Sequence, residues 1–286
     1  MQIGIMIPTV VPICTAEFVQ NVAKAAEDLG FHSLWAPEHV VLFDEYASRY
    51  PYSDDGRLGG AGGGPVDPFA VLTYAAGVTT RLRLGTGILL VPQRNPVYTA
   101  KDVASLDWMS GGRFDFGVGI GWLREEFKAL GVPWPRRGER TMAYLEVMKR
   151  LWADGMAEYH GEFYDLPACK QHPKPVQQPH PPIYFGGESD AALRRVAEGG
   201  QGWFGFNLDP AGAAARLQDL DGLLNAQGRS RADIQVSVCP GRRPVNRDEI
   251  VAYEAAGVDQ VICIVGGRDA MGTVQRLEAL AADTIG

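Results

Sequence analysis

The chain has 286 residues, of which 46% are hydrophobic and 21% charged, a composition that suits two average domains or one α/β barrel. Its 34 acidic residues outnumber its 27 basic residues, so no overall basic field exists to hold nucleic acid or an anionic membrane surface. Four cysteines without CxxC spacing are too sparse for a disulfide scaffold and predict reduced thiols in a cytoplasmic protein.

The first element is predicted to be a strand over about residues 2–8. The apolar opening MQIGIMIPTVVPIC superficially resembles a signal peptide, but it lacks a basic n-region and is interrupted by Pro8 and Pro12. No stretch of the sequence is long and apolar enough to predict a membrane span.

Two kinds of junction then repeat along the chain. Helix-like segments end at glycine and lead into short apolar runs, which predicts a helix, a glycine C-cap and a buried strand. The three examples are AAEDLGFHSLW, RVAEGGQGWFGF and YEAAGVDQVICIV. Strands are followed by a capping residue and a proline that suits the first helical turn, at Asp67-Pro68, Asn95-Pro96 and Asp209-Pro210. Asn246 with Glu249 resembles a capping box.

Eight βα units follow from these junctions. The predicted strands lie near 2–8, 32–36, 82–91, 114–118, 183–186, 202–206, 234–239 and 259–265. Eight such units in this length predict a single (β/α)8 TIM barrel domain over residues 1–286. A doubly wound sheet is disfavoured because GVGIGW and GTGILL have Trp122 and Leu90 where a dinucleotide fingerprint needs its third glycine.

Two segments are too long to be plain connectors. Residues 43–66 contain GGAGGGP, and residues 154–182 contain six prolines. We expect both to be loop insertions at the C-terminal mouth of the barrel, where they would define the substrate pocket. The first would act as a lid.

In a barrel, catalytic groups lie at the carboxyl ends of the strands. The stretch LWAPEHVVL places Glu38 and His39 at such an end, and glycines concentrate at the others, where they let a backbone approach a flat ligand. The sequence has no Walker loop, GxSxG, HExxH or HxH motif, and its five histidines are scattered, which predicts no metal site.

Four blocks together resemble the luciferase-like monooxygenase superfamily, and more narrowly its actinobacterial branch of probable coenzyme F420-dependent oxidoreductases. They are LGFHSLWAPEHV, the run from TTRLRLGTGILL to WLREEFKALGV, RGERTMAYLEVMKRLW and PPIYFGGESDAALRRVAEGGQGW. The resemblance is close over about residues 1–210 and implies a (β/α)8 barrel that binds a reduced deazaflavin or flavin at its mouth. Relatives that use FMN share this barrel, so FMN is the alternative cofactor.

The resemblance assigns roles to most of the rim. An acid followed by histidine ends the second strand in deazaflavin relatives, which implies a catalytic pair of Glu38 and His39. Histidine suits proton transfer because its pKa lies near neutrality; the alternative is that His39 only caps or packs. Gly87 to Ile88 matches a non-proline cis peptide behind the cofactor ring, or else is a close-packed strand glycine. Ile120, Gly121 and Glu125 match positions that touch the cofactor.

Trp122 replaces the catalytic glutamate of deazaflavin-dependent sugar-phosphate dehydrogenases. This difference argues against a sugar phosphate, and Trp122 either walls a pocket for an apolar or aromatic substrate or merely covers the barrel. The cofactor phosphate is expected at Gly186, Gly187 and Ser189, with Gly266 and Gly267 as the rival site. An anionic cofactor tail would need a basic cluster, either Arg136, Arg137 and Arg140 or Arg242, Arg243 and Arg247, although such clusters are often only solvated surface.

Three functions remain open at this point. The first is hydride transfer between deazaflavin and a small organic substrate, the second a reduced-FMN monooxygenase of the luciferase type, and the third a catalytically silent cofactor-binding protein. The expected partners are a small molecule and, from the resemblance, a second copy in a homodimer, with neither nucleic acid nor a membrane.

Overall fold

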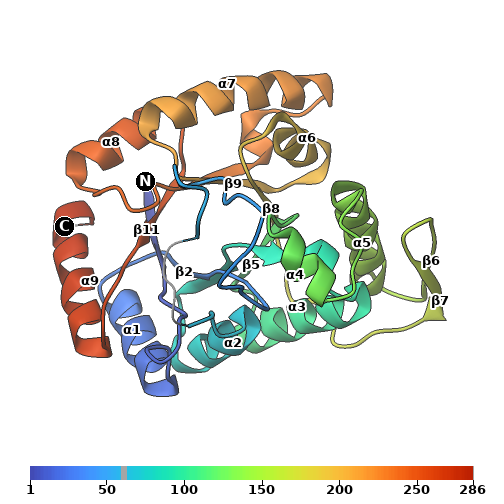
Figure 1. Cartoon of the computed structure of the whole chain (residues 1–286), viewed down its shortest axis with the longest axis horizontal. Coiled ribbons are helices and arrows are strands. Elements are labelled where there is room, and N and C mark those ends of the chain that lie inside the picture. The colour runs from blue at the N-terminus through green and yellow to red at the C-terminus, as the bar shows by residue number, and fades with distance from the viewer. Residues whose placement is uncertain (59–62, 286) are drawn as a thin grey trace.

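The fold is a closed barrel of parallel strands surrounded by helices, in a computed structural model that describes residues 1–58 and 63–285 (Figure 1). The barrel strands are β1 (Gln2–Met6), β2 (Ser33–Ala36), β3 (Arg83–Thr86), β4 (Leu89–Leu90), β5 (Phe114–Gly119), β8 (Ile183–Gly186), β9 (Gly202–Phe206), β10 (Gln235–Cys239) and β11 (Gln260–Ile264). They follow the order β3-β2-β1-β11-β10-β9-β8-β5-β4, and the additional pairing of β3 with β5 closes the ring. The predicted (β/α)8 barrel is therefore confirmed.

The helices that cover the barrel alternate with its strands. They are α1 (Ala16–Asp28), α2 (Pro68–Val78), α3 (Pro96–Ser110), α5 (Arg137–Trp152), α6 (Asp190–Gly199), α7 (Pro210–Ala226), α8 (Arg247–Ala255) and α9 (Ala270–Thr284), and the short α4 (Arg124–Ala129) precedes α5. In the part of the chain that the structure describes, 3₁₀ turns lie at Val91–Gln93 and Arg231–Asp233. Within residues 1–58 and 63–285, no helix has the length and apolarity needed to cross a bilayer.

The helix junctions form largely as their residues predict. Asp67, Asn95 and Asp209 cap α2, α3 and α7 through their side chains, and each is followed by proline in the first turn. Asn246 caps α8 by accepting from the Glu249 amide. Gly30 and Gly257 end α1 and α8 in the left-handed conformation, at φ +86° and +88°.

Gly200 is the C-cap of α6, as predicted, but with φ −77° and ψ 145° it is in extended rather than left-handed backbone. One predicted detail of these elements is wrong. The single predicted strand over 82–91 is interrupted, because β3 stops at Thr86 and β4 resumes for two residues at Leu89.

The barrel interior is filled rather than hollow below the mouth. Trp35, Tyr184 and Phe204 pack together there, with ring centroids 5.6 and 5.2 Å from Trp35. Glycines on neighbouring strands leave the space for these rings: a Cβ at Gly85 would lie 2.3 Å from Trp35, and one at Gly202 would lie 2.1 Å from Tyr184. Large rings opposite glycines thus close the floor of any cavity at the mouth.

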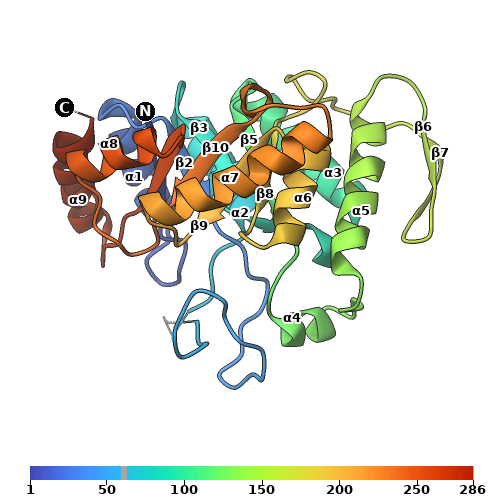
Figure 2. The ribbon, with the colours of Figure 1, turned by 90° about the horizontal axis from the view of Figure 1, so that it is seen from above.

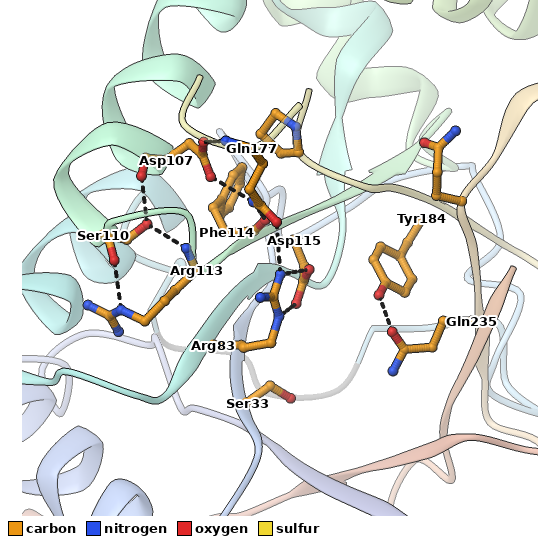
Figure 3. Close-up of polar contacts among 12 residues, drawn as sticks. Ser33, Arg83, Asp107, Ser110, Arg113, Phe114, Asp115, Gln177, Tyr184 and Gln235 are labelled. Carbon is orange, nitrogen blue, oxygen red and sulfur yellow. Dashed lines mark hydrogen bonds and ion pairs between the residues drawn. The ribbon is translucent and has the colours of Figure 1, made fainter. Parts of the chain in front are cut away.

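A polar cluster holds the opposite, amino-terminal end of the barrel (Figure 3). Arg83 on β3 pairs with the fully buried Asp115 on β5, with 2.9 Å between Nε and Oδ2. Gln177 donates to Asp107 Oδ1 (2.7 Å), at the end of α3, and to the Phe114 carbonyl (2.6 Å), at the start of β5. Gln177 therefore ties the segment 154–182 to this end.

The two long segments lie at different places. Residues 59–62 of segment 43–66, and so part of GGAGGGP, lie outside the described residues. The described parts of this segment project from the same end of the barrel as α4 (Figure 2). Segment 154–182 contains the antiparallel hairpin β6 (Ala157–His160) and β7 (Asp165–Cys169), which lies beyond α5. It leads from the end of α5 to the start of β8, and connections from a helix to a strand return to the amino-terminal end. The prediction that 154–182 sits at the mouth is therefore wrong, because its connectivity places it at the other end.

Candidate active site

A cavity of about 1660 Å³ opens at the carboxyl ends of the strands. This volume exceeds the roughly 300 to 1,000 Å³ typical of a pocket for one small ligand, so it can hold a cofactor and a second molecule. Ten of the eleven predicted site residues line it: Glu38, His39, Gly87, Ile88, Ile120, Gly121, Trp122, Gly186, Gly187 and Ser189. Residues of the segment after β2 also line it, whereas none of 154–182 does.

His39 lies just beyond β2 and is held by Glu126 of α4. Its Nδ1 lies 3.1 Å from Glu126 Oε2, and its side chain is 15% exposed while that of Glu126 is fully buried. Glu126 Oε1 accepts from the backbone amides of Val40 (2.6 Å) and Val41 (3.2 Å), and Oε2 also accepts from Gln93 Nε2 (3.1 Å). One carboxylate thus fixes both the histidine ring and the backbone that follows it.

Electrostatics decide which nitrogen of His39 carries the proton. Burial raises the pKa of Glu126, but the hydrogen bonds from His39, Gln93 and Val40 outweigh it and leave that pKa below its ordinary value. An ionised Glu126 can only accept, so neutral His39 carries its proton on Nδ1. Nε2 is then the nitrogen left to exchange a proton at the cavity.

Glu38 is engaged differently from its neighbour. Its buried carboxylate accepts from the Leu90 amide (2.5 Å) and from Arg94 Nε (2.6 Å), and Arg94 also pairs with Asp67 (2.6 Å). These contacts join the end of β2 to β4 and to the cap of α2. The adjacent acid and histidine therefore have different contacts: Glu38 is held by the Leu90 amide and Arg94 around the third strand, whereas His39 is held by Glu126 of α4.

The backbone between β3 and β4 forms a bulge at the cavity floor. The predicted non-proline cis peptide between Gly87 and Ile88 is present. The Ile88 side chain fills space left by glycines of β5 and β8, because a Cβ at Gly119 would lie 1.9 Å, and one at Gly186 2.7 Å, from its Cδ1. The bulge itself therefore requires glycine at these two positions. This requirement adds to the role expected from the sequence, in which glycine lets a ligand approach the backbone.

The end of β5 supplies Ile120, Gly121 and Trp122 to the cavity. Gly121 has φ +77°, a left-handed conformation that suits glycine. Glu125 is the predicted residue that does not line the cavity. Its carboxylate accepts from the Ala47 amide (2.8 Å) and from Ser48 Oγ (2.7 Å), so it anchors the segment 43–66 instead.

The loop after β8 carries the predicted phosphate site. The Gly187 amide already donates to the Phe204 carbonyl (3.3 Å), and Ser189 caps α6 by accepting from Ala192 (3.3 Å). Glu188, which we did not predict, accepts from the Phe206 amide (2.6 Å) and from the Tyr52 hydroxyl (2.7 Å). Gly186, Gly187 and Ser189 line the cavity, whereas the rival glycines 266 and 267 do not. The start of α6 is thus the helix N-terminus that faces the cavity from this loop.

The two basic clusters have different surroundings. Arg136 pairs with Glu139 and Glu162, and Arg140 is buried against backbone carbonyls such as that of Pro92. Of the second cluster, Arg242 lines the cavity. Arg242 is therefore the better placed cation for an anionic cofactor tail.

The sequence reasoning missed two acidic residues of the site, Glu126 and Glu188. It also missed the cavity-lining aromatic residues Tyr46, Tyr50, Tyr52 and Phe206. Glu126 follows the predicted Glu125 directly, and only the packing of α4 against His39 tells the two acids apart. In the described part of the chain, no group of three His, Cys, Asp or Glu side chains is placed to hold a metal ion.

Comparison with known proteins agrees with this geometry. A family model described as luciferase-like monooxygenase matches residues 1–283. The uncharacterized protein Rv0940c of Mycobacterium tuberculosis is 40% identical over 194 residues, which cover 68% of this chain and 66%, or just under two thirds, of that protein. The FMNH(2)-dependent dimethylsulfone monooxygenase of Pseudomonas putida is 33% identical over 156 residues, 53% of this chain and 42% of that one.

Among solved structures, the coenzyme F420 dependent tetrahydromethanopterin reductase of Methanopyrus kandleri superposes with a TM-score of 0.77 at 20% identity. The match covers 99% of this chain and 98% of the reductase, which supports the barrel fold. A family match over nearly the whole chain, together with the cavity at the barrel mouth, shows that the protein belongs to the luciferase-like monooxygenase family.

Proposed function

We propose that the protein is a coenzyme F420-dependent oxidoreductase that transfers hydride between the deazaflavin and a small organic substrate. The observation that carries this proposal is the contact between His39 and Glu126 at the edge of the cavity. When a hydride leaves a substrate carbon, the oxygen on that carbon also loses its proton, and in the reverse direction the oxygen gains one. A histidine held by a buried carboxylate can take and return that proton.

The residues at the mouth fit a deazaflavin. The Gly87 to Ile88 bulge offers a backbone surface against which a planar ring can lie. The start of α6, capped by Ser189, suits a phosphate, and Arg242 suits an anionic tail. When bound, the cofactor would supply a two-electron hydride acceptor or donor.

The chain's own residues would handle the proton. In the oxidising direction the substrate loses a hydride from carbon and a proton from oxygen, and Nε2 of His39 accepts that proton. In the reverse direction protonated His39 returns it to the carbonyl oxygen. Glu126 holds Nδ1 protonated in both directions and stabilises the charge that forms on the ring.

The alternative is a reduced-FMN monooxygenase, favoured by the similarity to the FMNH(2)-dependent dimethylsulfone enzyme. Anaerobic titration of the cofactor-free protein with F420 and with FMN separates the two. We expect F420 to bind at least tenfold more tightly than FMN. Tighter binding of FMN would refute the deazaflavin proposal and favour the monooxygenase.

Replacing His39 tests whether the protein is an enzyme or a silent binder. His39→Asn should keep F420 affinity within about threefold and lower turnover by about 10² to 10⁴, the usual contribution of general acid–base catalysis. Since the substrate is unidentified, turnover is followed as reoxidation of reduced F420 by a panel of carbonyl compounds. A variant as active as the wild type would remove His39 from the mechanism.

We also propose that the protein is a homodimer. The outer face of α3 exposes three large apolar side chains, Tyr98 (76%), Trp108 (60%) and Met109 (64%), and such patches on soluble proteins often mark interfaces. Light scattering on Trp108→Glu should then report a monomer where the wild type gives a dimer. A monomeric wild type would contradict this proposal and leave the catalytic one untouched.

A further inference from the structure

Five aromatic side chains form one continuous surface of the cavity, which we call the aromatic wall. Its members are Tyr46, Tyr50 and Tyr52 from the segment after β2, Trp122 from the end of β5 and Phe206 from the end of β9. Successive rings meet edge to face: the centroids are 5.6 Å apart for Tyr46 and Trp122, 5.1 Å for Tyr50 and Trp122, 5.5 Å for Tyr50 and Tyr52, and 4.8 Å for Tyr52 and Phe206.

The wall runs between two of the polar residues that line the cavity, His39 and Glu188. At one end Trp122 contacts the His39 ring, with centroids 5.8 Å apart. At the other end Tyr52 donates to Glu188 (2.7 Å), whose carboxylate also holds the Phe206 amide. A molecule lying along the wall would therefore have its reacting atom near His39.

All five rings remain only partly buried. Rings that served only to pack the segment after β2 would be expected to bury their faces against one another and the barrel. Here they leave apolar surface toward a cavity, and covering such surface with a ligand is favourable.

One hydroxyl on the wall stands apart from the others. The Tyr46 oxygen accepts from the Leu58 amide (2.7 Å), and the Tyr52 hydroxyl is used by Glu188. The Tyr50 hydroxyl forms no hydrogen bond with any part of the chain that the structure describes. Burial raises the pKa of Tyr50 to about 12, so its hydroxyl stays protonated at neutral pH and can donate.

We propose that the aromatic wall is the subsite for a substrate with a planar aromatic ring and, attached to that ring, a carbon that is an alcohol (bearing a C–H) in one direction of the reaction and a carbonyl in the other, and that the Tyr50 hydroxyl binds the oxygen on that carbon or a second oxygen on the same molecule. This proposal rests on the proposed function for its reaction and names the substrate class of the same site. An aliphatic molecule of equal size would bury a similar area, but it would lack the edge-to-face contacts that aromatic rings make with each other.

A matched pair of probes tests the preference for aromatic rings. 1-Naphthol and decahydro-1-naphthol share a carbon skeleton and a hydroxyl, but only the first is planar and aromatic. Their binding is measured by calorimetry on the protein with F420 bound and without it. We expect 1-naphthol to bind about three- to tenfold more tightly, the size of an aromatic pair contribution. Equal binding, or no binding of 1-naphthol, would overturn the proposal.

Variants of the wall test which residues are responsible. Tyr50→Phe, which keeps the ring and removes the hydroxyl, should weaken 1-naphthol binding about three- to tenfold, as the loss of one hydrogen bond does. Trp122→Leu should abolish the preference over the saturated alcohol. Tyr74→Phe on α2 and Met271→Leu on α9, two exposed side chains that do not line this cavity, are the matched controls and should leave both affinities unchanged.

The outcomes separate this proposal from the proposed function. F420 affinity is measured independently in each variant, so 1-naphthol binding with no F420 binding would support the aromatic subsite and refute the deazaflavin. F420 binding combined with equal affinity for the two alcohols would support the deazaflavin proposal and refute the aromatic subsite. If Tyr50→Phe binds 1-naphthol as tightly as the wild type, the assignment of the Tyr50 hydroxyl is wrong.

Discussion

Replacing Glu126 by glutamine tests how His39 is prepared for proton transfer. The carboxylate accepts four hydrogen bonds, from Val40, Val41, Gln93 and His39. Glutamine keeps the shape of the side chain but converts one oxygen into a donor. If its oxygen stays on the Val40 and Val41 amides, its NH₂ group faces the His39 ring and Gln93.

The variant can still satisfy most of these groups. Gln93 Oε1 is buried and has no hydrogen-bond partner among the described residues, so rotating the Gln93 amide would present an acceptor to the new NH₂ group. His39 would accept through Nδ1 and move its proton to Nε2, which inverts the tautomer at the cavity. We therefore expect a folded protein whose turnover falls by about 10² to 10⁴, because Nε2 no longer accepts a proton at rest.

The cost in stability can be estimated from the contacts. Hydrogen bonds to a charged group contribute about 1 kcal/mol more to stability than hydrogen bonds between neutral groups, so the glutamine variant loses this difference at several bonds. The variant also avoids the cost of burying a charge, which offsets part of that loss. We expect a net loss of about 1 to 3 kcal/mol in the free energy of unfolding, read from urea denaturation. Glu146→Gln, a change to an exposed acid on α5 paired with Lys149, is the control and should alter neither stability nor turnover.

The same variant predicts a dependence on pH. The folded-state pKa of Glu126 lies below its ordinary value of 4.5. Its ionised form thus stabilises the fold fully above that value, and the contribution disappears as pH falls through the lowered pKa. The stability gap between wild type and Glu126→Gln should be constant near neutral pH and should narrow in acid. A gap that widens in acid, or unchanged turnover in the variant, would refute this account of Glu126.

Three further changes probe the surroundings of the site. Gly119→Ala puts a Cβ 1.9 Å from Ile88 Cδ1, so we expect a loss of about 1 to 3 kcal/mol in unfolding free energy and at least tenfold weaker F420 binding. Gly222→Ala on α7 meets nothing within 4 Å and should instead stabilise by about 0.5 to 1 kcal/mol, which thermal melting can check. Glu125→Gln should loosen the segment 43–66 at Ala47 and Ser48, seen as faster proteolysis there, and an unchanged cleavage rate would contradict that anchor.

Much of the barrel could be predicted because its signals are local. Capping residues before proline, and glycine after a helix, act within a few positions, so Asp67, Asn95 and Gly30 are readable from sequence. The interruption between β3 and β4 is not local, since it depends on glycines of β5 and β8 that make room for Ile88.

The position of the site could be predicted, but the contacts among its residues could not. Placing residues at strand ends located the cavity, and resemblance to a family pointed to His39 and to the Gly87 to Ile88 peptide. The choice of Glu126 over Glu125 depends on which face of α4 meets the segment after β2, and no periodicity in a six-residue helix reveals that. The aromatic wall joins residues from three separate regions of the chain, so only the folded structure brings it together.

The most direct test of the central claim is a structure of the protein with F420 bound. We predict that the deazaflavin ring lies against the Gly87 to Ile88 backbone, with His39 Nε2 within about 4 Å of the substrate position beside it, close enough for proton transfer directly or through one water. A ring bound away from that bulge, or a His39 side chain turned away from the ring, would contradict the account.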